Sequence, residues 1–222
     1  RIVSFRAPIL KRVLEDRITF MTKIVLASAS PSRQRLLRSA GIEPLIMVSG
    51  VDEEDPRYAE LTPREMVIAL AIVKAHTIKE KIDFPAIVIG CDSTFEFEGR
   101  SLGKPETPER AIERATMMRG KSGVLHTGHC IIDTKKGIEV SDVASTRVFF
   151  ADMSDDEIQS YVATGEPLNV AGGFTLDGLS SPFISKVEGE ASNVIGLSLP
   201  LVRKAFITLG YDWFDFVSAQ KK

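Results

Sequence analysis

Apolar and polar residues alternate in blocks along the first half of the chain, and these blocks predict strands and helices in turn. An apolar run predicts a strand at 23–28, and leucines at helical spacing predict a helix over 32–40. A second strand is predicted at 44–49. Continuous apolar residues at 86–90 predict a strand that is buried on both faces.

Helix starts carry signals of their own. Thr62 and Ser154 each stand three residues before a glutamate, which is the spacing of a capping box. Pro63 follows Thr62 and occupies the first helical position, where its missing N–H costs nothing. A further helix is predicted to begin at Thr107 and to end near Gly120.

The second half of the chain is richer in β structure. Strands predicted at 124–133 and 139–150 flank a turn at 135–137. Another strand is predicted at 183–187 and a closing helix at 200–210. Together these elements predict an α/β fold with a mixed central sheet flanked by helices, either as a single body or as two lobes with a cleft.

Composition and charge narrow the classes of partner. Of the 222 residues, 44% are apolar and 26% charged, as in ordinary soluble globular proteins. The net charge of −2 gives no general basic field, so we expect no nucleic-acid partner. No apolar run approaches the roughly 20 residues that span a bilayer, so we expect no membrane partner. The distant Cys91 and Cys130 indicate neither a disulfide framework nor a metal site, which favours a cytoplasmic location.

The first 20 residues differ from the rest of the chain. Residues 1–20 mix basic, acidic and apolar side chains, without the apolar core of a signal peptide. Met21 directly precedes the first predicted strand. We therefore expect one domain over 21–222, preceded by an N-terminal extension of natural or vector origin.

The junction after the first predicted strand is the first candidate for chemistry. The motif Leu-Ala-Ser-Ala-Ser-Pro-Ser-Arg gathers Ser28, Ser30, Ser32 and Arg33 where a helix begins. A helix N-terminus has unpaired N–H groups and a partial positive charge, so hydroxyls and a guanidinium added there can bind a polyphosphate. The alternative is an ordinary serine-capped helix, and this junction alone favours neither interpretation.

Asp92 is the candidate reactive carboxylate. It directly follows the predicted strand at 86–90, where open α/β sheets place ligands. A carboxylate there can bind a divalent cation or accept a proton from water. Glu53, in an acidic run at 52–55, can join it in holding Mg²⁺ or Mn²⁺. Taken singly, a turn-capping aspartate and a solvated acidic loop are the simpler interpretations.

Two lysines can direct positive charge toward a phosphate. Lys104 lies in the motif Leu-Gly-Lys-Pro, whose glycine and proline restrict the loop and so position the lysine. Lys74 follows the apolar face of the helix that begins after Thr62, and it can reach a cleft. The simpler alternative for each is a lysine that extends into solvent.

Several apparent motifs are set aside. Gly120-Lys121-Ser122 resembles the end of a P-loop, but the first P-loop glycine is replaced by Ala115 and the motif follows a helix. His126 and His129 are three positions apart on a predicted strand, so they point to opposite faces. A serine hydrolase is poorly supported because there is no Gly-x-Ser-x-Gly motif.

Taken in order, the short motifs after Met21 resemble the Maf family of nucleoside triphosphate pyrophosphatases. Each motif is weak alone, but the ordered series is specific. The segments that carry the resemblance are 26–37, 51–53, 71–75, 89–92, 102–105, 127–128, 165–167, 171–178 and 193–200. The resemblance implies a two-lobed fold similar to inosine-triphosphate pyrophosphatases, a homodimer, and metal-dependent hydrolysis of a nucleoside triphosphate to its monophosphate and pyrophosphate.

The same resemblance implies roles for individual residues. Asp92 matches the family's catalytic aspartate, described as a proton acceptor, and Glu53 matches an acidic site residue. Arg33, Lys74 and Lys104 match cations on the phosphate side. These charges suit the reaction, because cations and a metal offset the charge of a pyrophosphate leaving group while a carboxylate deprotonates water.

Three departures from the commonest family pattern bear on the base. Ser32 replaces an arginine, Ser93 replaces a threonine, and Asp177 stands where members that hydrolyse dTTP or UTP have glutamine. A carboxylate only accepts hydrogen bonds, which suits the N1–H and exocyclic amine of guanine. We therefore expect a guanine-type base, with 7-methyl-GTP as one candidate.

Two alternatives stay open. One is a dTTP or UTP pyrophosphatase. The other is a nucleotide-binding regulatory module without hydrolysis, because an arginine is missing at Ser32 and a lysine at Val170 relative to the family pattern.

Overall fold

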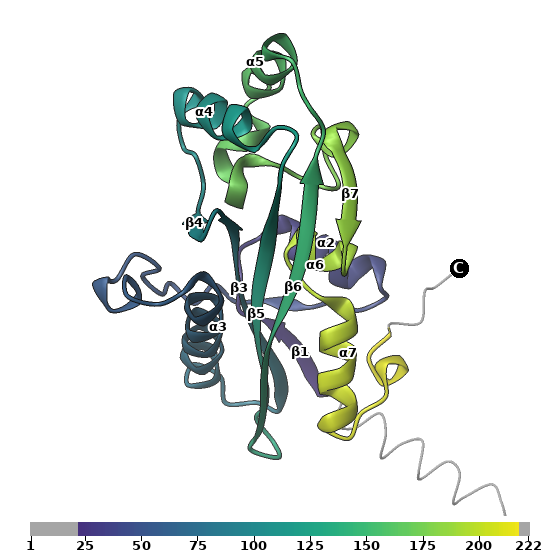
Figure 1. Cartoon of the computed structure of the whole chain (residues 1–222). Helices are drawn as coiled ribbons and strands as arrows, with labels where there is room; N and C mark the ends of the chain where they lie inside the picture. Colours follow the sequence, from purple (N-terminus) through teal and green to yellow (C-terminus); the bar gives the residue numbers. More distant parts are fainter. Residues whose placement is uncertain (1–21, 218–222) are drawn as a thin grey trace, which may run out of the picture.

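The computed structural model describes residues 22–217 around a seven-stranded sheet (Figure 1). The strand order is β2-β1-β3-β5-β6-β7, and β4 pairs with β3. β1 runs parallel to β2 and β3, and the other neighbours are antiparallel, so the predicted mixed sheet is confirmed. The strands are β1 (Lys23–Leu26), β2 (Leu45–Ile46), β3 (Ala86–Phe97), β4 (Arg100–Leu102), β5 (Ser122–Asp133), β6 (Ile138–Phe150) and β7 (Ile184–Glu188).

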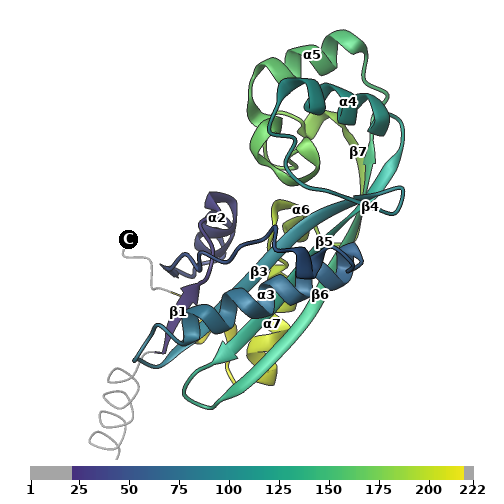
Figure 2. The same ribbon diagram turned by 90° about the vertical axis from the view of Figure 1, so that its left-hand side faces the viewer.

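Helices cover both faces of this sheet (Figures 1 and 2). α3 lies on one face and α7 on the other, while α4 and α5 pack together near one end of the long strands. The α-helices are α2 (Pro31–Ser39), α3 (Pro63–Lys79), α4 (Pro108–Met118), α5 (Asp155–Ala163), α6 (Ala191–Ile195) and α7 (Leu199–Thr208). Short 3₁₀ helices occupy Pro56–Tyr58, Glu166–Asn169, Ala171–Gly173, Ser181–Phe183 and Trp213–Asp215.

The central strands bury both faces because their alternate side chains enter different cores. Ile87 and Ile89 of β3 pack in the core that contains Phe206 of α7. Val88, between them, packs in the core that contains Ala75 of α3. A continuous apolar run is therefore what this strand requires, as the sequence predicts.

The predicted helix starts are confirmed. Thr62 accepts a hydrogen bond from the Glu65 N–H, and the Glu65 carboxylate accepts one from the Thr62 N–H. Ser154 forms the same reciprocal pair at the start of α5. Thr107 caps α4, which begins at Pro108. These signals are local, so tertiary structure does not alter them.

The end predicted for the third strand is wrong. β3 does not stop at Gly90 but continues to Phe97, and its residues from Ile87 to Glu96 pair with β5. Asp92 therefore lies within the strand, opposite Gly128, rather than after it. The polar residues from Asp92 onward interrupt the apolar signal, but backbone pairing with β5 does not depend on it. Neither the short strand β4 nor the short helix α6 was predicted from the sequence.

Two glycines bring α3 close to the sheet beside Asp92. A Cβ atom on Gly90 would overlap the Ala71 carbonyl oxygen and lie 2.7 Å from the Ala75 nitrogen. A Cβ atom on Gly128 would overlap the Val67 carbonyl. The backbone of α3 therefore rests against β3 and β5, and Lys74 extends from this helix toward Asp92.

No helix in residues 22–217 is long and apolar enough to cross a membrane. The expected extension over 1–20 and the domain start at Met21 lie outside the described residues. The two-lobed arrangement, the homodimer and the cytoplasmic location stay predictions from the sequence.

Candidate active site

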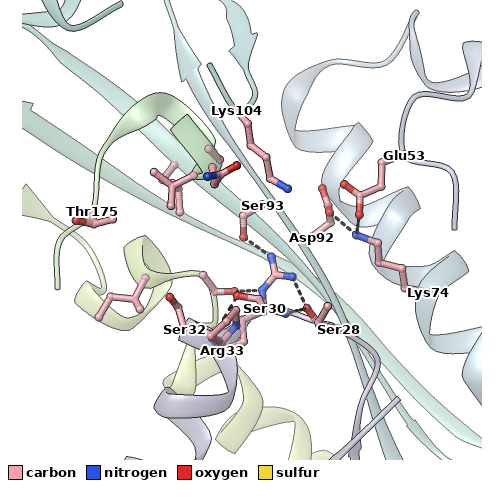
Figure 3. Close-up of a pocket in the computed structure, with 18 of the residues that line it drawn as sticks. Ser28, Ser30, Ser32, Arg33, Glu53, Lys74, Asp92, Ser93, Lys104 and Thr175 are labelled. Carbon is pink, nitrogen blue, oxygen red and sulfur yellow. Dashed lines mark hydrogen bonds and ion pairs between the residues drawn. The ribbon is translucent and has the colours of Figure 1, made fainter. Parts of the chain in front are cut away.

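A cavity of about 490 Å³ opens between the start of α2, the side of α3 and the glycine-rich segment 171–178 (Figure 3). Every site residue predicted from the sequence lines it. These residues are Ser28, Ser30, Ser32, Arg33, Glu53, Lys74, Asp92, Ser93, Lys104 and Asp177. The fold thus gathers candidates that are far apart in the sequence into one pocket.

The junction before α2 is both a capped helix and a wall of the pocket. Ser30 is the N-cap of α2, and its hydroxyl accepts the Arg33 N–H. The Ser28 hydroxyl accepts the Ser30 N–H at 3.2 Å. The two interpretations of this motif are therefore compatible, because the capped helix directs its N-terminus toward the cavity.

The protein itself binds most of the Arg33 guanidinium. Nε donates to the Gly196 carbonyl at 2.8 Å, Nη1 donates to the Cys91 carbonyl and to Ser28, and Nη2 donates to Ser93 at 2.9 Å. The residue is only 9% exposed. Arg33 thus acts largely by holding Ser28 and Ser93 in place, a role that the sequence did not indicate.

The charge of Arg33 nevertheless has no carboxylate within salt-bridge distance among residues 22–217. A buried charge without a counter-ion is unfavourable, so an anion in the pocket would compensate it. The Ser28 oxygen accepts from the guanidinium, which leaves its proton available for that anion.

Lys74 lies between two carboxylates at the centre of the site. Its ammonium is 2.6 Å from Asp92 Oδ1 and 2.6 Å from Glu53 Oε1. The Lys74 and Asp92 side chains are 7% and 10% exposed, whereas the Glu53 side chain is 54% exposed. Figure 3 shows both carboxylates directed at the lysine.

These contacts keep Lys74 and Glu53 charged at neutral pH. Burial by itself lowers the pKa of Lys74, but Asp92 and Glu53 outweigh burial and hold that pKa above its usual value. Burial raises the pKa of Glu53, but the hydrogen bond and charge of Lys74, with the charges of Lys104 and Arg33, hold that pKa below its usual range. The cluster therefore contains a carboxylate, Asp92, that can accept a proton, and a cation, Lys74, that holds this carboxylate in position.

The donor set fits a divalent cation only in part. In residues 22–217 no three His, Cys, Asp or Glu side chains come together as a metal site. Lys74 occupies one oxygen of Glu53 and one of Asp92, and no hydrogen bond within this part of the chain engages the second oxygen of either. Mg²⁺ is commonly held by one or two carboxylates together with substrate phosphates. These residues therefore fit a metal that binds with a phosphate-bearing ligand.

The Lys104 loop is tied to the glycine-rich segment above the cavity. The Gly103 carbonyl accepts the Gly172 N–H at 3.2 Å and the Arg114 guanidinium at 2.6 Å. Gly172 has φ 75°, a conformation that favours glycine. Lys104 itself is exposed toward the pocket, where its ammonium is available to a ligand.

The pocket has an apolar end opposite its ionic centre. Figure 3 places Ser32 and Thr175 on one side, with Glu53 and Lys74 on the other. On the side of Thr175, the segment around the glycines and α6 contribute the apolar residues Val170, Phe174, Leu176, Val194 and Ile195. Val48, Val51 and Leu125 also line the pocket. Ionic groups at one end and apolar groups at the other suit a ligand with a phosphate chain and a flat ring.

Asp177, predicted to contact the base, already has a partner. Arg35 Nη2 lies 3.2 Å from Asp177 Oδ2 and 3.0 Å from the Ser32 hydroxyl. Arg35 was not predicted as a site residue. Its one available signal was its place on α2, three residues after Ser32 and so on the same helical face.

The motifs set aside lie outside the pocket. His126 contacts Glu96 and Ser145, whereas His129 accepts the Ser198 N–H, so the two rings lie on opposite faces as predicted. Burial and the charge of Arg33 lower the pKa of His129 to about 3, which keeps this ring neutral. Lys121 pairs with Glu98 at 3.1 Å.

Fold and site together define an α/β protein whose pocket contains a buried carboxylate–lysine pair and a buried guanidinium. Residues 23–209 match the Maf family, described as Maf-like protein, and the chain belongs to this family. A relative from Streptomyces coelicolor, "Nucleoside triphosphate pyrophosphatase", is 52% identical over 85% of this chain and 91% of its own length. A protein with the same description from Salinispora tropica is 50% identical over 84% of this chain and 84% of its own length. Another, from Thermosynechococcus vestitus, is 48% identical over 88% of this chain and 98% of its own length.

Proposed function

We propose that this chain is a nucleoside triphosphate pyrophosphatase. It would hydrolyse the bond between the α and β phosphates and release a nucleoside monophosphate and pyrophosphate. The relatives with that description support the activity. The observation that carries the proposal is the buried Asp92–Lys74 pair, which lies in one cavity with the uncompensated charge of Arg33.

In the proposed reaction, water attacks the α phosphorus while Asp92 accepts its proton. The bond from the α phosphorus to the bridging oxygen breaks, and that oxygen leaves with the pyrophosphate. Lys74 keeps Asp92 oriented. The start of α2, Ser28 and Lys104 bind the phosphates and offset their charge.

We also propose that Mg²⁺ or Mn²⁺ takes part, held by Glu53, Asp92 and the phosphates of the substrate. When bound, it would supply positive charge that stabilises the departing pyrophosphate. Because Lys74 occupies one oxygen of each carboxylate, the protein alone offers few ligands. Metal binding should therefore depend on nucleotide.

Metal binding is expected to stabilise the protein only when a nucleotide is present. Mg²⁺ alone should leave Tm nearly unchanged, whereas Mg²⁺ with a non-hydrolysable triphosphate should add about 2.7 kcal/mol at a hundredfold excess over Kd. Differential scanning fluorimetry measures this, with Glu53→Gln expected to lose the metal-dependent part. Strong stabilisation by Mn²⁺ alone would contradict the proposal.

For the base, we propose a guanine-type ring, as in GTP or 7-methyl-GTP, recognised through Asp177. The carboxylate lines the apolar end of the pocket and can accept the N1–H and amine of guanine. A pyrophosphatase for dTTP or UTP is the alternative, and its preference would appear in the same assay.

Asp177→Gln is expected to lower kcat/KM for guanine substrates relative to UTP. The loss of a charged acceptor should cost roughly 1–3 kcal/mol, or about fivefold to 150-fold. Pyrophosphate release from a nucleotide panel measures these ratios, with the exposed Asp83→Asn as a charge-matched control. Equal ratios in wild type and Asp177→Gln would remove Asp177 from base recognition.

The same panel tests the proposed activity itself. Pyrophosphate release from at least one nucleotide is expected with wild-type protein. Stabilisation by nucleotides without turnover would instead support the non-hydrolytic binding module.

A further inference from the structure

Arg35 joins the two sides of the apolar end of the pocket. It extends from α2, and its Nη2 bonds to Ser32 on the same helix and to Asp177 on the glycine-rich segment. Ser32 and Asp177 both line the cavity. Arg35 is 61% exposed in its side chain and contacts the cavity through these two residues.

This pairing changes the charge that the ring of a nucleotide would meet. Asp177 alone would make the apolar end of the pocket negative. With the guanidinium of Arg35 at 3.2 Å, the pair carries no net charge. The other carboxylates that line the cavity, Glu53 and Asp92, are paired with Lys74 at the opposite end.

The net charge of the pocket around the base determines which of two kinds of guanine ring binds better. A neutral guanine and a cationic 7-methylguanine both present an amine to a carboxylate, so hydrogen bonding to Asp177 distinguishes them poorly. A lone carboxylate would attract the cationic ring, whereas a guanidinium beside that carboxylate repels it. The guanidinium of Arg35 beside Asp177 therefore determines whether the neutral or the cationic guanine ring is favoured.

We propose that Arg35 is a positioning residue that sets base specificity through Asp177, so that the pocket favours a neutral guanine ring over a cationic one. This inference rests on the proposed nucleotide substrate and deepens it. Arg35 holds Asp177 in place, cancels its charge, and thereby removes the advantage of a positively charged base.

The local fold allows this role to be separated from a structural one. An exposed ion pair contributes little to stability, so Arg35→Gln should fold normally. Arg38 is a matched control on the same helix, because its pair with Glu43 at 2.8 Å is similarly exposed and neither residue lines the cavity.

The test compares kcat/KM for 7-methyl-GTP and GTP, together with Kd for 7-methyl-GMP and GMP by titration calorimetry. Arg35→Gln is expected to raise the 7-methyl-GTP to GTP ratio about threefold to tenfold, mainly through KM. Arg35→Lys should retain a ratio near that of wild type because it retains the charge. Arg38→Gln should leave the ratio unchanged.

An unchanged or lower ratio in Arg35→Gln would overturn the inference, as would an equal change in Arg38→Gln. The monophosphates keep this separate from the proposed activity. If wild type hydrolyses neither triphosphate but the Kd ratio shifts as expected, the activity fails and the role of Arg35 stands. If both triphosphates are hydrolysed and neither ratio shifts, the role of Arg35 alone fails.

Discussion

Replacing Asp92 by asparagine is expected to lower kcat for pyrophosphate release by about 10²–10⁴-fold, the range for loss of a general base. The amide has nearly the shape of the carboxylate but cannot accept the proton of the attacking water. Nucleotide binding should persist, because the start of α2, Arg33 and Lys104 are untouched. A coupled pyrophosphate assay measures kcat, and calorimetry measures Kd for a non-hydrolysable triphosphate.

The geometry makes Asp92→Asn a clean test of chemistry. Lys74 keeps Glu53 at 2.6 Å when Asp92 loses its charge, so the buried ammonium is not left without a counter-ion. Tm should therefore fall little, and Asp83→Asn serves as the exposed control. Retention of kcat within a fewfold of wild type would assign the proton acceptor elsewhere.

Lys74→Met is expected to destabilise the protein by about 3–5 kcal/mol and to abolish turnover. The substitution leaves Asp92 as a buried carboxylate without its partner, and breaking a buried pair from one side is strongly unfavourable. Urea unfolding at pH 7 measures the change in the free energy of unfolding.

The double variant Lys74→Met/Asp92→Asn identifies the cause. Removing both charges should recover much of the stability that Lys74→Met loses, because no buried charge then remains unpaired. A loss below about 1 kcal/mol in Lys74→Met, or no recovery in the double variant, would show that the pair is not buried as described.

The stabilisation by this cluster has a defined pH window. The pKa of Glu53 is lowered on folding, so its contribution is lost as pH falls through that lowered pKa. The pKa of Lys74 is raised, so its contribution is complete below its usual value of 10.5 and is lost as pH rises through the raised pKa. The difference between wild type and Lys74→Met should therefore be constant near neutrality and shrink at both extremes.

The parts of the fold that were predicted from the sequence are those with local signals. The capping boxes at Thr62 and Ser154 and the turn at 135–137 depend on neighbours within a few residues. The extent of β3 beyond Gly90 depends on pairing with β5, which is distant in the sequence. The polar side chain of Asp92 therefore does not mark the end of this strand.

Within the site, the sequence indicated which residues gather but not which contacts they make. Arg33 was assigned to a phosphate as a cation, yet its Nε donates to Gly196, 163 residues away. Asp177 was assigned as a hydrogen-bond acceptor for the base, yet Arg35 reaches it from 142 residues away. Such pairings arise from tertiary packing, so neither motif contained them.

The close approach of α3 at Gly90 and Gly128 has a consequence for how this protein can vary. Both glycines contact helix backbone and do not line the pocket, yet they set how far Lys74 must reach to Asp92. Any side chain at either position would move the helix outward and lengthen that reach. The two glycines and Lys74 therefore constrain one another. A variant with a larger residue in place of either glycine would lose the contact between Lys74 and Asp92, although every residue that lines the pocket is unchanged.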